Sequence, residues 1–360
     1  MTENRLLLEV RDHLEPLTDE WEELAERTHA PPFVRPGWIG AWRGAFGRGR
    51  LRLFVLRRGD RLAALIPLEQ RRGALRSPTN EHTPEFGLLA VDEDAAGALA
   101  RAVFAHGARA VVVAWLDADG TALAVLRSAA RDAGYRDLIS PMARSPYIVG
   151  RRDLREHERR LSRNLRHDVQ RRLRRLCEAG AVSVQVCDGT DRLEELLEEG
   201  FRVERHSWKG DGGTAIGSRA ETLRFYTEVA RWAASEGWLR LAFLRLDERP
   251  IAFQLDLEAG GTYRSLKIGY DATYERFSPG KLLAYTMVSR AMSKGLATYE
   301  LLGTDEPWKE RWTNTFHERV ALHAFAGSPS GRLTRWAFAY GRPLARRVPL
   351  AARVGMALRR

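Results

Sequence analysis

The sequence predicts an α/β protein of the α+β type, made of two similar halves that each carry a mixed, mostly antiparallel sheet flanked by helices. The first observation is length, because 360 residues suffice for two domains of roughly 150 residues, each with its own core. The second is composition, since 44% apolar and 29% charged residues are ordinary for a soluble globular protein. The third is a repeated order of strand and helix patterns.

The first half alternates short apolar strands with amphipathic helices. Gly59 and Asp60 favour a tight turn between two strands, and residues 36–46 suit a short helix rich in aromatic side chains. The predicted elements are a strand at 5–10, helices at 14–28 and 36–46, a hairpin at 51–56 and 62–68, a strand at 86–91, a helix at 95–105, a strand at 110–116, a helix at 121–133 and a last extended segment ending near Val149.

The second half repeats this order without obvious identity of residues, which we interpret as an architectural duplication. Its predicted elements are a strand at 182–186, helices at 191–208 and 221–235, a hairpin at 239–246 and 251–257, a strand at 262–270, a helix at 279–294, a strand at 298–302, a short helix at 307–313 and a final strand at 319–326. We therefore expect domains at 1–150 and 181–327, a linker at 151–180 and a tail at 328–360.

The net charge of +11 favours an anionic partner, such as a nucleotide-bearing cofactor, nucleic acid or an anionic membrane surface. Two cysteines, Cys177 and Cys187, supply neither a disulfide framework nor a metal set, and the nine histidines lack metal-ligand spacing. No apolar run reaches the ~18 residues of a membrane span, and the first residues lack the features of a signal peptide. We therefore expect a cytoplasmic protein that uses no metal.

Arginine dominates residues 154–176, where apolar residues recur at helical spacing and Gly180 follows the predicted helix end. One interpretation is a solvated helix that joins the two domains. The other is a basic surface for RNA or membrane. Because no aromatic residue interleaves the arginines for base stacking, we favour the first. The apolar stripe consists of Leu154, Leu161, Leu165, Val169, Leu173 and Leu176.

The start of the predicted helix at 279–294 suits a phosphate. Ser278 is a good N-cap, and Pro279 at the first helical position has no N–H to leave unsatisfied. Gly280 lets a ligand approach the backbone, and Lys281 adds a cation where free N–H groups already favour an anion. The corresponding helix of the first half opens with acids at 92–94, which would repel a diphosphate. We therefore expect one active and one degenerate half.

Three groups of residues carry a resemblance to a known superfamily. Residues 270–283 contain Tyr-Asp, a later Tyr and Ser-Pro-Gly; residues 303–312 read Gly-Thr-Asp-Glu-Pro-Trp-Lys-Glu-Arg-Trp; the first half has Pro-Gly-Trp at 36–38 and Ile-Pro-Leu at 66–68. With the element order over residues 1–326, these resemble the GNAT acyltransferases. Within them, the chain is similar to the CelD/BcsL-like acetyltransferases, tandem GNAT folds associated with cellulose synthesis and related to Fem-type aminoacyltransferases.

The resemblance implies that an acyl-CoA, such as acetyl-CoA, binds between the fourth strand and third helix of the second half. A backbone N–H of that strand would meet the thioester carbonyl. Gly269 is the expected site of strand distortion, with an ordinary strand end as the alternative. The loop departs from the common Arg/Gln-x-x-Gly-x-Gly/Ala pattern, because Phe-Ser-Pro-Gly-Lys follows Arg276. The expected coenzyme-binding residues are Ile268, Gly269, Arg276, Phe277, Ser278, Pro279, Gly280 and Lys281.

Candidates for the catalytic base are Asp256, Tyr270 and Asp305, which come late on strands or just after one. For Asp305 the alternative is that it only caps a turn. Lys309, four residues beyond Asp305, would hold an acidic group of the acceptor or pair with Asp305. The glycine-rich segment at 209–217 is a mobile lid or a plain flexible loop. The residues expected to meet the acceptor are Trp208, Lys209, Lys309 and Trp312, with a core or wall position as the alternative for Trp312.

The expected function is N-acyl transfer from acetyl-CoA or a related thioester to a small or saccharide-linked amine. The resemblance connects it to cell-envelope or exopolysaccharide biosynthesis. One alternative is Fem-type transfer of an aminoacyl group from tRNA, motivated by the basic linker, although nucleic acid is the less favoured partner. Another is a non-catalytic scaffold that binds RNA or an anionic membrane, the latter through the basic tail at 328–360.

Overall fold

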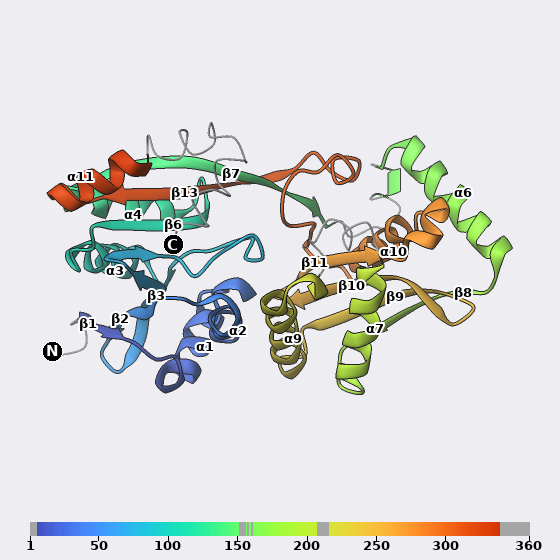
Figure 1. The fold of residues 1–360 in the computed structure, drawn as a ribbon, viewed down its shortest axis with the longest axis horizontal. Coiled ribbons are helices and arrows are strands. Elements are labelled where there is room, and N and C mark those ends of the chain that lie inside the picture. Colours follow the sequence, from blue (N-terminus) through green and yellow to red (C-terminus); the bar gives the residue numbers. More distant parts are fainter. Residues whose placement is uncertain (1–5, 151–155, 157, 160, 207–215, 339–360) are drawn as a thin grey trace, which may run out of the picture.

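The structure is a computed structural model that describes residues 6–150, 156, 158–159, 161–206 and 216–338. Mixed sheet and flanking helices make up both halves, which confirms the predicted fold class (Figure 1). The first half consists of β1 (Leu6–Arg11), α1 (Thr18–Arg27), α2 (Pro36–Phe46), β2 (Arg50–Arg58), β3 (Arg61–Arg71), β4 (Ala74–Arg76), β5 (Leu89–Ala90), α3 (Glu93–Ala105), β6 (Ala110–Asp117), α4 (Thr121–Asp132) and β7 (Arg136–Val149).

The second half begins with the helix α6, which lies at the outer end of the molecule (Figure 1). Its elements are α6 (Arg163–Ala179), β8 (Val182–Cys187), α7 (Leu193–Arg205), α9 (Ala220–Ser235), β9 (Leu239–Leu246), β10 (Arg249–Ala259), β11 (Thr262–Tyr270), the 3-10 helix η4 (Ala272–Phe277), α10 (Pro279–Ser293), β12 (Thr298–Glu300), β13 (Phe316–Phe325) and α11 (Pro329–Trp336).

The strands join into one continuous sheet rather than two separate ones. Its order is β1-β2-β3-β4-β6-β13-β7-β12-β11-β10-β9-β8, with β5 beside β3. The long strand β7 makes the connection, because Pro146 pairs with Phe316 of β13 while Val149 pairs with Thr298 of β12. Figure 1 shows β7 running from one half to the other. The last strand, β13, pairs with β6 and β7 and thus completes the sheet of the first half.

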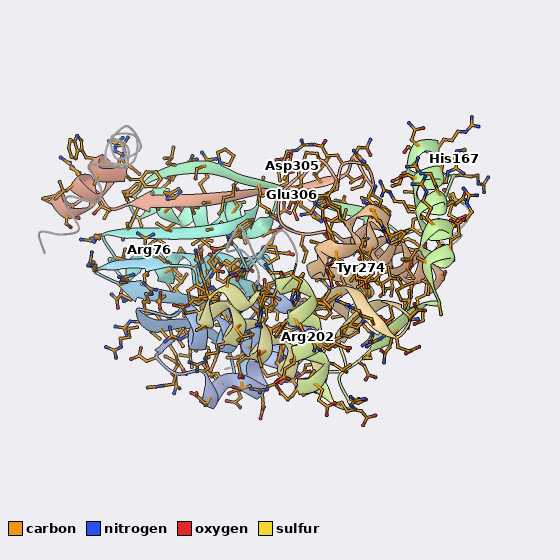
Figure 2. All side chains as sticks on the ribbon, turned by 45° about the vertical axis from the view of Figure 1, so that its right-hand side comes forward. Arg76, His167, Arg202, Tyr274, Asp305 and Glu306 are labelled. Atoms are coloured by element: carbon orange, nitrogen blue, oxygen red, sulfur yellow. The ribbon has the colours of Figure 1, made fainter. Side chains whose placement is uncertain are left out.

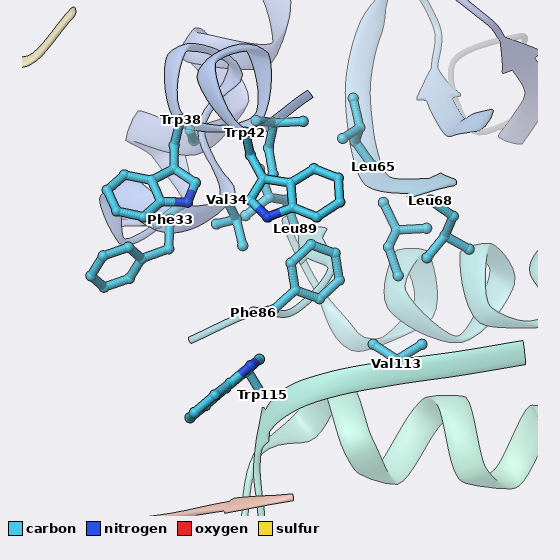
Figure 3. Close-up of a cluster of buried hydrophobic side chains, with 14 of the residues drawn as sticks. Phe33, Val34, Trp38, Trp42, Leu65, Leu68, Phe86, Leu89, Val113 and Trp115 are labelled. Atoms are coloured by element: carbon cyan, nitrogen blue, oxygen red, sulfur yellow. The ribbon is translucent and has the colours of Figure 1, made fainter. Parts of the chain in front are cut away.

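The buried side chains form one cluster that both halves share and a second cluster that belongs almost entirely to the second half. One buried cluster contains side chains from α1 to β6 together with side chains of α7, α9 and β10. Within this cluster the two halves contact each other through α2 and α9, where the ring centroids of Trp38 and Phe225 lie 5.2 Å apart, edge to face. A Cβ on Gly37 would lie 2.2 Å from the ring of Trp232, so only glycine allows this approach. Figure 3 shows the aromatic part of the cluster that belongs to the first half.

Three predicted elements need correction. The strand predicted at 86–91 is only β5, and the helix predicted at 307–313 consists of turns. The linker helix α6 begins at Arg163 because the Ser162 side chain accepts a hydrogen bond from the Leu165 N–H at 3.1 Å and caps it. Its stripe is buried at Leu161, Leu165, Val169 and Leu176, whereas Leu173 is 43% exposed.

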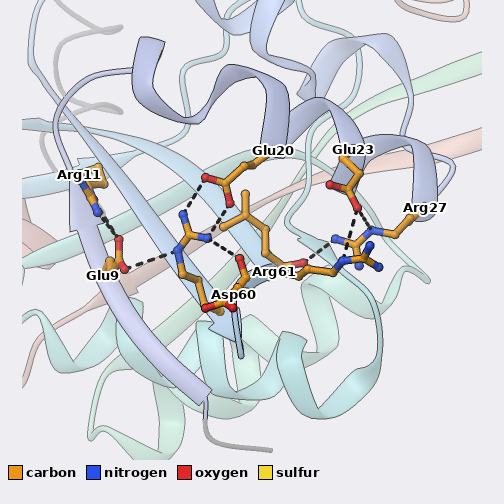
Figure 4. Close-up of polar contacts among 9 residues, drawn as sticks. Glu9, Arg11, Glu20, Glu23, Arg27, Asp60 and Arg61 are labelled. Atoms are coloured by element: carbon orange, nitrogen blue, oxygen red, sulfur yellow. Dashed lines mark hydrogen bonds and ion pairs between the residues drawn. The ribbon is translucent and has the colours of Figure 1, made fainter. Parts of the chain in front are cut away.

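Many arginines of the first half are paired with acids on neighbouring elements. Arg57 of β2 contacts Glu20 of α1 at 2.5 Å and Glu9 of β1 at 3.5 Å. Figure 4 shows these two acids among the polar contacts of this region. Much of the positive charge of this half is therefore neutralised locally. Within the described residues, none of the helices combines the length and the apolar character that crossing a bilayer requires.

Candidate active site

The neighbouring strands β11 and β12 are paired over a short stretch and then diverge, which leaves a pocket between them. They pair in parallel only from Thr262 with Thr298 to Arg264 with Glu300, where β12 ends and β11 continues. The pocket beyond has a volume of about 510 Å³. It is lined by Glu81, His82, Pro84, Leu165, Tyr226, Ser265, Leu266, Lys267, Ile268, Gly269, Tyr270, Glu275, Ser278, Gly280, Lys281, Leu301, Leu302, Gly303, Glu306, Trp308, Lys309, Arg311 and Trp312.

The free edge of β11 forms one wall of this pocket. Residues 265–270 all line it, although side chains of a strand point alternately to opposite faces. An uninterrupted run of lining residues therefore means that the pocket meets the backbone edge itself. Backbone N–H groups along such an edge can stabilise the oxygen of a carbonyl that gains negative charge.

The distortion predicted at Gly269 lies elsewhere. Gly269 pairs in register with Phe253 of β10, whereas the register shifts at Leu255 and Asp256, leaving Leu266 as the extra residue on β11. Glycine at position 269 has a packing reason. A Cβ there would lie 2.5 Å from Glu204 Cγ and 2.8 Å from Glu204 Cα, so α7 can rest on the strand only at a glycine.

The start of α10 differs from the predicted N-cap. Ser278 has the left-handed conformation (φ 50°, ψ 56°), and its side chain makes no capping hydrogen bond. Its carbonyl instead accepts the N–H groups of Lys281 at 3.0 Å and Leu282 at 3.2 Å, so these two donors do not point at a ligand. Gly280 accommodates the Tyr270 ring, which would lie 3.1 Å from a Cβ. Only part of the predicted anion cradle is therefore available.

A second pocket adjoins the first where α6 packs on α10. Its volume is about 480 Å³, and Leu165, Lys281 and Arg311 line both pockets. The Lys281 ammonium donates to Asp168 of α6 at 2.7 Å. Burial alone would raise the pKa of Asp168, but hydrogen bonds from Lys281, Arg172 and Arg171 hold it well below its usual range. The remaining residues of this pocket are Ser162, Asn164, Asp168 and Arg172.

The three candidate bases occupy different environments. Asp256 is fully buried, accepts a hydrogen bond from the Tyr263 hydroxyl at 2.8 Å and does not line the pocket. Burial raises the pKa of Asp256 well above its usual value, and its position off the pocket lining leaves it out of reach of an acceptor in the pocket. Asp305 also lies off the pocket lining, with Arg144 Nη1 at 3.4 Å (Figure 2).

Tyr270, the third candidate, does line the pocket. Burial, and to a smaller extent Glu275, raise the pKa of its phenol. Near neutral pH the hydroxyl therefore keeps its proton, which suits a proton donor better than a base.

Lys309 does not pair with Asp305, as one of its predicted alternatives required. Its ammonium donates to the carbonyls of Leu302 at 2.8 Å and Thr304 at 3.0 Å, and Glu306 lies at 3.2 Å. It thus holds the chain that leaves β12 while lining the pocket. Trp312 is 6% exposed and lines the pocket too, in agreement with a wall position.

The other predicted site residues are less well placed or lie outside the described part of the chain. Phe277 and Pro279 are buried, and the exposed Arg276 stacks on the Phe277 ring at 4.7 Å; none of the three lines the pocket. Trp208, Lys209 and most of the predicted lid at 209–217 fall outside the described residues. No group of three or more His, Cys, Asp or Glu side chains within residues 6–150, 161–206 and 216–338 could hold a metal ion.

Sequence reasoning missed the contribution of the first half and of α9. Glu81, His82 and Pro84 reach the pocket from the first half, and Tyr226 reaches it from α9. The Tyr226 hydroxyl lies 3.2 Å from His82 Nδ1. Because these residues are 144 positions apart in sequence, no local pattern could have brought them together.

Comparisons with known proteins agree with this arrangement. Residues 163–310 match the family model described as acetyltransferase (GNAT) domain. FemX has a similar fold, with a TM-score of 0.63 and 13% identity over 90% of this chain and 99% of that one. L-PGS from Bacillus licheniformis follows with a TM-score of 0.55 and 13% identity, over 88% of this chain and 94% of that one. No curated protein matches the sequence. The second half thus carries an acyltransferase domain of the GNAT type.

Proposed function

We propose that this protein transfers the acyl group of an acyl-CoA, with acetyl-CoA as the simplest case, to the amine of a small or saccharide-linked acceptor. The observation that carries the proposal is the parting of β11 and β12 over a pocket that continues into a second, basic pocket. Acyl-CoA carries its thioester at one end and its phosphates at the other. It therefore needs a site where the thioester can contact a strand edge and the phosphates can contact cations.

The residues present fit such a co-substrate. The acyl end would lie along residues 265–270, where a backbone N–H of β11 would stabilise the thioester oxygen. The diphosphate would lie nearer α6, where Arg172, Arg311 and Lys281 supply positive charge. Asp168 holds Lys281 in place but also takes part of its charge, so Arg311, which is exposed and lines both pockets, is the cation best able to meet a phosphate.

The remaining pocket walls suit a polar acceptor that carries an amine. Carboxylates of Glu81, Glu275 and Glu306 and the hydroxyl of Ser265 line the pocket. Acids of this kind attract an ammonium group and accept hydrogen bonds from sugar hydroxyls. The expected connection to cell-envelope or exopolysaccharide synthesis stays part of this proposal, as do the cytoplasmic location and the membrane contact of the tail.

One observation favours a second candidate, the transfer of an aminoacyl group from tRNA. The outer face of α6 exposes Arg163, Arg171, Arg174 and Arg175, and His167 points away from the body of the molecule (Figure 2). Such a face would attract a phosphate backbone. Transfer activity that survives ribonuclease treatment of the purified protein would exclude this candidate.

Calorimetry with acetyl-CoA tests the leading proposal. We expect the double variant Lys281→Ala/Arg311→Ala to bind about 100-fold more weakly than the wild type, since each lost contact of ~1.4 kcal/mol is worth a factor of ten. A control variant, Arg71→Ala/Arg101→Ala, removes the same charge from exposed positions of the first half and should bind normally. A wild-type protein that binds no acetyl-CoA would contradict the proposal.

A further inference from the structure

The first half sends one loop, residues 77–88, to the pocket of the second half. The chain leaves the sheet after β4 and returns to it at β5. At its tip, Glu81, His82 and Pro84 form part of the pocket wall. The opposite walls come from β11, α10 and the segment after β12. The pocket is therefore closed by both halves.

This loop is fixed to the core of its own half. The Ser77 N–H donates to the Val112 carbonyl at 3.0 Å, and the Phe86 N–H donates to the Trp115 carbonyl at 2.9 Å. Between these ends, the indole N–H of Trp38 donates to the hydroxyl of the fully buried Thr83 at 3.3 Å. The position of His82 is thus set by the packing of the first half.

The imidazole of His82 is enclosed by aromatic rings. It stacks on Phe46 with ring centroids 5.5 Å apart and an angle of 24°, and it meets the Tyr226 ring edge to face at 5.5 Å. Its side chain is 12% exposed, and Glu81 Oε1 lies 3.8 Å from Nε2. Burial, with a smaller effect of Lys267, lowers the pKa of His82 to about 4, so the ring is neutral at physiological pH.

The tautomer of His82 decides which of its nitrogens can accept a proton, because either partner of the contact between Tyr226 Oη and His82 Nδ1 can be the donor. Burial raises the pKa of Tyr226 well above 10, so its hydroxyl remains a phenol. When the Nδ1–H of His82 donates to Tyr226 Oη, the lone pair is left on Nε2. In this tautomer the imidazole can accept a proton at Nε2, as a general base must.

We propose that His82 is the general base of the reaction and that the first half thereby supplies the acceptor side of the site. The inference rests on the proposed acyl transfer. The amine nitrogen attacks the thioester carbon, its proton passes to His82 Nε2, and the carbon–sulfur bond breaks to release the thiolate. The imidazolium then returns the proton to the thiolate, giving the amide and free coenzyme A. The Glu81 carboxylate stabilises the imidazolium while it exists.

Several charged groups set the proton affinity of His82. Glu81 on the same loop raises its pKa, whereas Lys267 of β11 and Arg219 beside α9 lower it. Tyr226 contacts it directly, and Glu204 of α7 acts on Tyr226. A Lys267→Met variant removes one cause of the lowering, so it should raise the pKa of His82. NMR titration of the imidazole would measure this directly.

The kinetic test uses acetyl-CoA with glucosamine or 2-aminoethanol as acceptor. We expect His82→Gln to lose at least ~100-fold in kcat/KM, the lower end of what a general base contributes, while acetyl-CoA binds with unchanged affinity. In the wild type kcat/KM, calculated for the concentration of unprotonated amine, should have an acid limb that follows the imidazole titration. Lys267→Met should move both upward in pH. A matched control is His106→Gln, since burial also lowers the pKa of His106 in the first half but it does not line the pocket.

Each result separates this inference from the proposed function. A wild type that binds no acetyl-CoA would overturn the acyl-CoA proposal. A wild type that binds acetyl-CoA but acylates neither amine would overturn the small or saccharide-linked amine as acceptor, which belongs to the proposed function. Full activity of His82→Gln, or an acid limb that ignores Lys267→Met while the imidazole titration moves, would overturn the assignment of His82 as the general base. Circular dichroism and thermal melting of His82→Gln and His82→Asn verify that both variants are folded.

Discussion

The two halves place the same elements around the same point of the sheet but treat the space there differently. In the second half, β11 and β12 pair over a short stretch and then part over the pocket, with α10 crossing between them. In the first half, β4 and β6 pair in parallel from Ala74 with Ala110 to Arg76 with Val112, and α3 takes the place of α10. Beyond that point the buried rings of Phe86 and Trp115 lie together with Trp42 (Figure 3).

The difference shows that this topology alone does not make a site. The loop that follows β4 carries Phe86 into the interior of its own half and carries His82 to the neighbouring pocket. In the second half the loop after β11 is the short η4, which leaves the strand edge open. The second half thus has the pocket, whereas the first half has none at the equivalent position and contributes part of the pocket wall.

The largest expected effect is a difference in stability between two glycine-to-alanine variants, one in the second half, which has the pocket, and one in the first half. Gly269→Ala places a Cβ 2.8 Å from the backbone of Glu204, and we expect a cost of about 1–3 kcal/mol, as for other overpacked sites, together with reduced transfer because β11 shifts. Gly87→Ala meets only Ala122 at 3.7 Å and should be neutral. Urea unfolding measures both, and equal stability of the two variants would contradict this account.

The next effect concerns the contact between α6 and α10, which the first half lacks. Asp168→Asn should lower the free energy of unfolding at pH 7 by about 1.5–2 kcal/mol, at the lower end of the range for hydrogen bonds to charged groups. The folded pKa of Asp168 is depressed, so its contribution is present above the unfolded value of about 3.9 and is lost as the pH falls toward the folded value. The wild-type advantage should therefore shrink below about pH 4.

Glu178→Gln is the matched control on the same helix, because Glu178 is exposed. Its effect should stay within about 0.5 kcal/mol, as is usual for surface substitutions. A difference between wild type and Asp168→Asn that stays constant from pH 7 to pH 2 would show that the charge of Asp168 does not stabilise the contact.

The smallest effect compares the two helix starts. Asp92 caps α3, since its side chain accepts the Ala95 N–H at 2.8 Å, and Asp92→Ala should cost about 1 kcal/mol. Ser278 makes no such bond and has a positive φ, so Ser278→Gly should cost nothing and could gain up to about 1 kcal/mol. Thermal unfolding of the two variants checks the opposite signs. If Ser278→Gly lost as much stability as Asp92→Ala, the Ser278 side chain would cap α10 as the sequence predicted.

The sequence was informative wherever a local pattern decides the outcome. The aromatic pattern of residues 36–46 predicted α2 over the residues it occupies, and the turn at Gly59 predicted the β2–β3 hairpin. The run from Ile268 to Lys281 led to the pocket, because a strand edge and a helix start adjacent in sequence must also be adjacent in space.

What could not be predicted depends on contacts between distant residues. Nothing near Lys281 in the sequence shows that it pairs with Asp168, and nothing near Asp256 shows that β10 is buried on both faces. His82 carries no motif, since its role depends on Tyr226 and on the path of a loop from the other half. Trp208 and Lys209 remain predictions.

The insertion of β13 between β6 and β7 has a consequence for how the protein is made. A ribosome delivers residues 1–150 early, yet the strand that joins β6 to β7 ends only at Phe325. Until then the two strands have unpaired edges, a state that invites association with other chains. The sheet of the first half can therefore close only after residue 325 has been synthesised, so neither half is an independent product and expression of either one alone should yield aggregates.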